Sequence, residues 1–131
     1  YFGRLLSTHE VASVTGACLA TTKDLWNEVG GLDQEFLTVA YNDVDYCLKV
    51  RKKGLKVLLV PDSKVIHHES LSRGLDDEID NNERLRREVD AMKTRWGNFL
   101  FIDPAYNPNL SFDGGSFKIS RSPRYIPPWD L

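Results

Sequence analysis

The stretch from residue 40 to residue 74 limits the fold of this chain most, because it joins a helix pattern to a strand pattern. Residues 41–53 place apolar side chains at helical spacing, with acids in the first turn and basic residues in the last. Gly54 then stops the helix, and the apolar run KVLLV at residues 56–60 is typical of a strand buried on both faces. Helix, glycine and strand in this order make half of an α/β layer repeat, so we expect an α/β fold.

The segment upstream, residues 9–22, has the β-branched and small residues of a buried strand, interrupted by Gly16. The glycine indicates either a strand that crosses another element or a ligand that approaches Gly16 and Ala17, and both interpretations are open. Residues 23–29 predict a short helix, capped by Thr22 and ended by the two glycines that follow, one of them left-handed.

The downstream region predicts one long helix and then an irregular tail. Apolar residues recur at steps of three and four between residues 79 and 96, and the arginines among them alternate with acids as on a solvated face. Turn-forming residues dominate after Gly97. A second hypothesis is a non-catalytic module for dimerisation or docking, in which aromatic residues of this region form the interface. They are Trp96, Phe99, Phe101, Tyr106, Tyr125 and Trp129.

Bulk composition narrows the class of protein. A chain of 131 residues with 41% hydrophobic content suits one domain, in which residues 1–75 form the main α/β part and residues 76–131 pack on it. A net charge of -2 gives no basic field for nucleic acid. Cys18 and Cys47 lack the CxxC spacing, so we expect two core thiols in a reducing compartment, which favours the cytoplasm. The first residue is Tyr1, and we expect a piece of a longer protein.

Asp43 and Asp45 match a D-x-D metal motif, but helix geometry argues against that use. Residues two apart on a helix point about 200° away from each other. Asn42 is a good N-cap. If Asp43 itself lies at the cap, its side chain is free to face a cleft while Asp45 braces the first turn. An ionised carboxylate at a helix N-terminus suits a general base, and two ordinary capping acids are the alternative.

Residues 64–67 predict a second short strand, and the pair His67 and His68 lies at its carboxyl end. Neighbours in an extended segment point to opposite faces, so one histidine at most serves a given site. To bind a metal ion, this histidine would need two or three further ligands from elsewhere. The alternative is that it is a polar residue at the edge of the sheet. Arg73, between serines and Gly74, could grip a phosphate.

Taken together, VTGACLATTKDLWNEVGGLDQEF and YNDVDYCLKVRKKGLKVLLVPDSKVIHHESLSRG resemble the C-terminal half of a family-2 glycosyltransferase of the GT-A fold. The tail resembles bacterial transferases that build O-antigen and related surface polysaccharides. The resemblance implies a Rossmann-like mixed sheet and inverting transfer from a nucleotide-diphosphate-sugar to a glycan or lipid-linked acceptor. It also implies that this half alone lacks the nucleotide-binding residues. A homodimer and association with the inner face of the cell membrane are open.

The resemblance also implies roles for single residues. Asp43 would be the general base that deprotonates the acceptor hydroxyl. His67, with His68 as the alternative, would bind Mn²⁺ or Mg²⁺ on the donor diphosphate.

Four further positions would contact substrate. Gly16 and Ala17 would line the cleft, and Arg73 would close over the diphosphate. Asn42 stands where the family has Glu, and it would lie at the acceptor contact.

Overall fold

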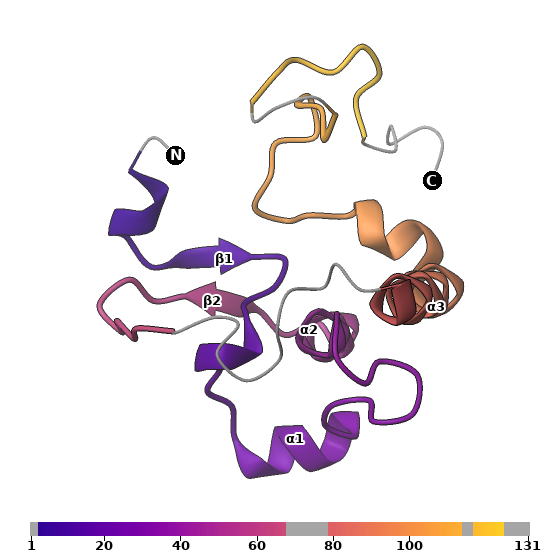
Figure 1. Ribbon diagram of the computed structural model, residues 1–131. Helices are drawn as coiled ribbons and strands as arrows, with labels where there is room; N and C mark the ends of the chain where they lie inside the picture. Colours follow the sequence, from indigo (N-terminus) through magenta and orange to yellow (C-terminus); the bar gives the residue numbers. More distant parts are fainter. Residues whose placement is uncertain (1–2, 68–78, 114–116, 125–131) are drawn as a thin grey trace.

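The computed structural model describes residues 3–67, 79–113 and 117–124. Its elements follow the chain as η1 (Arg4–Leu6), β1 (His9–Val11), η2 (Gly16–Cys18), α1 (Lys23–Val29), α2 (Asn42–Lys52), β2 (Val57–Leu59), α3 (Ile79–Trp96) and η3 (Gly97–Phe101). The fold is a small mixed α/β arrangement in which α2 occupies the middle (Figure 1). Within these residues, no helix is both long enough and apolar enough to cross a membrane.

The sheet consists of two strands in the described part of the chain. β1 and β2 pair antiparallel, with His9 opposite Leu59 and Val11 opposite Val57. The prediction that residues 56–60 are buried on both faces is wrong, because Val57 is buried and Leu58 is 49% exposed. The two strands cover one side of α2 and leave their other face open, which explains this alternation.

The predicted strand at residues 9–22 is also wrong over most of its length. Pairing ends at Val11, and Gly16 opens a 3-10 turn in which the Thr15 hydroxyl accepts a hydrogen bond from the Ala17 N–H at 3.3 Å. This local capping competes with strand pairing, as Thr side chains often do. Cys18 ends the turn and is exposed, so the expectation that it is a core thiol is wrong.

The two flanking helices confirm their predictions. α1 spans Lys23–Val29, with Thr22 Oγ1 accepting from the Leu25 N–H at 3.2 Å. Gly30 and Gly31 follow with φ values of 81° and 59°, which only glycine adopts at low cost. α3 spans Ile79–Trp96, and η3 continues it into turns. The piece at residues 64–67 forms no strand, contrary to expectation.

Helix α2 is buried on two opposite sides, and this decides the packing. One core lies on the side of α2 that faces the sheet and α1, and it is formed by Tyr46, Cys47, Val50 and Val57. Leu48 forms a second core with Leu37 and Met92, on the α3 side. Figure 1 shows α2 between α3 and the sheet, with α1 beneath it. The middle of α2 is therefore packed against neighbours from both halves of the chain.

Candidate functional site

Asp43 lies in the first turn of α2 and reaches back to the turn at Gly16. Its Oδ2 accepts a hydrogen bond from the Gly16 N–H at 2.7 Å, and its Oδ1 accepts from the Val44 N–H at 2.8 Å. A methyl group placed on Gly16 would lie 3.3 Å from the Asp43 Cβ, so the two segments are in close contact. The structure thus brings together Gly16 and Asp43, which are 27 residues apart.

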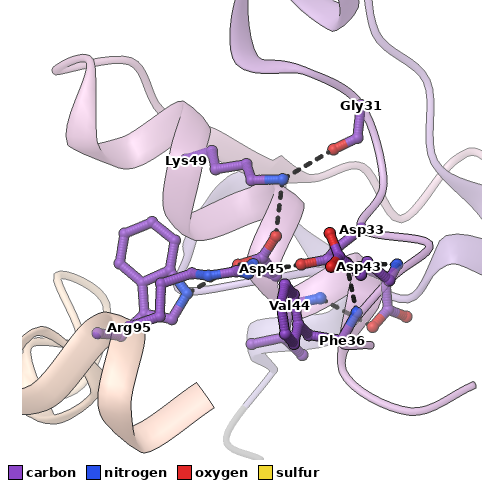
Figure 2. Close-up of polar contacts among 10 residues, drawn as sticks. Gly31, Asp33, Phe36, Asp43, Val44, Asp45, Lys49 and Arg95 are labelled. Atoms are coloured by element: carbon purple, nitrogen blue, oxygen red, sulfur yellow. Dashed lines mark hydrogen bonds and ion pairs between the residues drawn. The ribbon is translucent and has the colours of Figure 1, made fainter. Parts of the chain in front are cut away.

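Asp45 points away from Asp43 into the contact between α2 and α3 (Figure 2). Its side chain is fully buried, and its Oδ1 accepts from Arg95 Nη1 and Trp96 Nε1, each at 2.9 Å. Lys49 Nζ lies 2.8 Å from its other oxygen. The two carboxylates do not converge, as helix geometry predicts, and Asp45 is a brace.

Asp33 closes the turn that leads from α1 toward α2. Its Oδ1 accepts from the Glu35 and Phe36 amides at 2.8 Å, and its Oδ2 lies 2.5 Å from Arg95 Nη2. Burial alone would raise the pKa of Asp33, but these hydrogen bonds outweigh it and lower the pKa to about 2. Hydrogen bonding to Asp45, above all, and to Asp33 raises the pKa of Arg95.

Arg95 therefore joins three elements, and neither it nor Trp96 was among the site residues expected from sequence. Trp96 is the last residue of the apolar pattern in residues 79–96, and that pattern gives no sign that its indole N–H donates to a buried acid. Burial also raises the pKa of the Cys47 thiol, and the nearby Asp43 carboxylate raises it further.

Asn42 and Ala17, two further residues predicted to contact substrate, lie next to Asp43 and Gly16 in the sequence. Asn42 is half-buried and is the first residue of α2. The prediction that it caps the helix is wrong: the cap position belongs to Tyr41, whose φ of 64° is left-handed and whose side chain makes no capping bond. Ala17 follows Gly16 in the 3-10 turn and is exposed.

The predicted metal ligand, His67, lies at the end of the described segment and is exposed. Within residues 3–67, 79–113 and 117–124, no three His, Cys, Asp or Glu side chains gather closely enough to hold a metal ion. These residues alone therefore do not fit a divalent cation. His68 and Arg73 lie outside the described residues.

The hollows found among the described residues lie along the C-terminal segment. One of about 560 Å³ is lined by Phe112 and Arg124, and one of about 480 Å³ by His9 and Tyr106; Asp43 lines neither. Asp43 is half-buried.

Several aromatic residues expected at an interface pack within the chain. The Trp96 and Phe99 rings lie 5.8 Å apart, and the Tyr106 ring stacks on Phe112 at 5.3 Å. Phe101 is exposed, and Tyr125 and Trp129 lie outside the described residues. Trp96, Phe99 and Tyr106 are therefore half-buried within the chain.

Comparison with known proteins adds relatives that are much longer than this chain. The chain is 46% identical over 125 residues to the uncharacterized protein y4gI of Sinorhizobium fredii, and the match covers 95% of this chain and 14% of that protein. It is 31% identical over 130 residues to the O-antigen biosynthesis protein RfbC of Myxococcus xanthus, covering 93% and 9%.

A third relative matches a shorter part. An N-acetylglucosaminyl-diphospho-decaprenol L-rhamnosyltransferase of Mycobacterium tuberculosis is 31% identical over 70 residues, covering 53% of this chain and 22% of the relative. No family model and no solved structure matches the chain.

Proposed function

We propose that this chain belongs to a glycosyltransferase and forms the part of its active site that activates the acceptor. The donor would be a nucleotide-diphosphate-sugar and the acceptor a glycan or lipid-linked sugar, in the assembly of a surface polysaccharide. The names of the M. xanthus and M. tuberculosis relatives support this class of reaction. The chain spans 9–22% of the length of those relatives. We therefore assign no residue of this chain to recognition of the donor.

The observation that carries the proposal is the seating of Asp43. The carboxylate lies at a helix N-terminus, where the backbone dipole stabilises negative charge, and the Gly16 amide holds its Oδ2 at 2.7 Å. Each carboxylate oxygen has two lone pairs, so one protein hydrogen bond per oxygen leaves room to accept from a substrate hydroxyl. The side chain is half-buried, which keeps it accessible to a sugar.

The reaction then follows from this one group. The acceptor hydroxyl oxygen attacks the anomeric carbon of the donor sugar, and its proton passes to the Asp43 carboxylate. The bond from the anomeric carbon to the diphosphate oxygen breaks, and its electron pair leaves with the nucleoside diphosphate. Attack from the face opposite the leaving group inverts the anomeric configuration.

The role of a divalent cation is tested separately from the role of Asp43. The resemblance implies that His67 binds Mn²⁺ or Mg²⁺ on the donor, and the described residues supply no ligand set around it. We derive no step from a cation. Titration of Mn²⁺ into the full-length protein and its His67→Ala variant, in the presence of donor, measures that role directly.

The Asp43→Asn variant tests the base. General base catalysis contributes roughly 10²- to 10⁴-fold, so kcat is expected to fall at least about 100-fold while the KM for the donor stays within about twofold. Asp24→Asn is the matched control, because Asp24 holds the same second position in α1 and has no assigned role. Near-normal transfer by Asp43→Asn, with folding intact by circular dichroism, would remove Asp43 as the base.

A further inference from the structure

A second buried acid, Glu88 of α3, holds the backbone just before the proposed base. The residue is 2% exposed although it lies within the charged run RLRREVD. Its Oε1 accepts from the Thr38 hydroxyl at 3.1 Å and from the Val39 N–H at 2.9 Å, and its Oε2 accepts from the Ala40 N–H at 3.1 Å. One carboxylate thus collects three donors from three consecutive residues.

Those three residues lead directly into the strained start of α2. Tyr41 follows with a φ of 64°, a left-handed conformation that is unfavourable for a non-glycine residue, and its side chain makes no capping bond. Its carbonyl accepts the Asp45 N–H at 2.8 Å, which begins the helix. A conformation of this kind persists only where its surroundings hold it, and the carboxylate of Glu88 fixes the two amides before it.

Helix α3 holds the other contacts of this segment as well. Arg95 lies seven residues after Glu88, so both side chains project from the same face of α3. Arg95 binds Asp33 and Asp45, while Glu88 binds residues 38–40 between them. The segment that carries Asp43 is therefore attached to α3 at both ends and near its middle.

From this geometry, and resting on the proposed function of Asp43, we infer that Glu88 is a positioning residue for sugar transfer. It acts through Asp43 by fixing the backbone that sets where the carboxylate lies relative to the acceptor hydroxyl. Both oxygens must accept for this to work. A glutamine at this position keeps one acceptor and turns an NH₂ group toward one of the N–H donors.

Steady-state kinetics of Glu88→Gln and Glu88→Ala in the full-length protein test the inference. A misplacement of about 1 Å can cost about 100-fold in rate, so kcat is expected to fall about 10- to 100-fold with a donor KM within about twofold. Glu83→Gln, at an exposed position of the same helix, is the control and should keep wild-type kinetics. If Glu88→Ala does not fold, Thr38→Val, which removes one of the three donors, gives a milder loss in the same direction.

A double-mutant cycle separates positioning from general damage. If Glu88 acts through Asp43, adding Glu88→Gln to Asp43→Asn lowers kcat no further, whereas independent effects would multiply. Multiplying effects overturn the inference, as do Glu88 variants with wild-type kcat beside an inactive Asp43→Asn. A fully active Asp43→Asn instead defeats the proposed function itself, and the positioning role with it.

Discussion

At the scale of single residues, the contact between Gly16 and Asp43 allows a test of crowding without a change of charge. Gly16 does not require a left-handed conformation, so alanine fits its backbone. The added methyl group would lie 3.3 Å from the Asp43 Cβ, which is tighter than most such contacts, and at an ordinary contact distance of 3.6 Å from Oδ2. The effect of Gly16→Ala should therefore appear at Asp43.

For Gly16→Ala we expect kcat to fall about tenfold, because the carboxylate must shift by a few tenths of an ångström. The midpoint of urea unfolding should change little, since the site is exposed. Transfer kinetics and unfolding curves on the same preparation measure both quantities. An unchanged kcat would show that the position of Asp43 tolerates the shift.

Asp33 gives a prediction about stability and pH. Its pKa is lowered from 3.8 to about 2 in the folded protein, so its charge stabilises the fold above about pH 4, and this contribution is lost as the pH falls from about 4 to about 2. Asp33→Asn should therefore cost about 1 to 2 kcal/mol of unfolding free energy at neutral pH. Urea unfolding of both proteins between pH 2 and 6 should show the difference closing below pH 4. A difference that stays constant across this range contradicts the assignment.

At the scale of elements, the joint between α2 and α3 depends on one buried carboxylate. Asp45 accepts from Arg95 and Trp96 of α3 and pairs with Lys49 of its own helix. Asp45→Asn keeps the shape but removes the charge, leaving Arg95 with Asp33 as its remaining partner. We expect a loss of about 2 to 4 kcal/mol in unfolding free energy.

This loss distinguishes the two neighbouring acids. Asp43→Asn should change stability by less than about 1 kcal/mol, because its contacts are hydrogen bonds at a half-buried position. Guanidinium unfolding of Asp43→Asn, Asp45→Asn and the control Asp24→Asn measures the contrast. Equal losses at the two positions would mean that Asp45 is no brace.

The sequence predicts elements well where the signal is local. The Thr22 cap and the apolar steps of residues 79–96 place α1 and α3 correctly. The strand at residues 9–22 is overestimated because β2, its partner, offers only three residues for pairing. Strand length thus depends on a segment more than 40 residues away, which no local pattern reports.

At the scale of the whole molecule, the parts of the site that sequence reasoning missed are those held by distant contacts. Asp43 and Gly16 could be singled out from local patterns, and the structure places them together. The left-handed Tyr41 has no local signal, since tyrosine rarely adopts such a φ. Glu88 resembles the exposed acids around it in sequence, and its burial follows only from where α3 packs.

These distant contacts also set an order in time. Glu88 bonds to residues 48 to 50 positions before it, and Arg95 to residues 50 and 62 positions before it. At about 5 to 20 residues per second, a ribosome adds Glu88 roughly 2 to 9 s after Asp43. During synthesis, the segment around Asp43 is therefore present for seconds before the α3 residues that hold it. A nascent chain stopped before Glu88 carries the proposed base but lacks the contacts of Glu88 that position it.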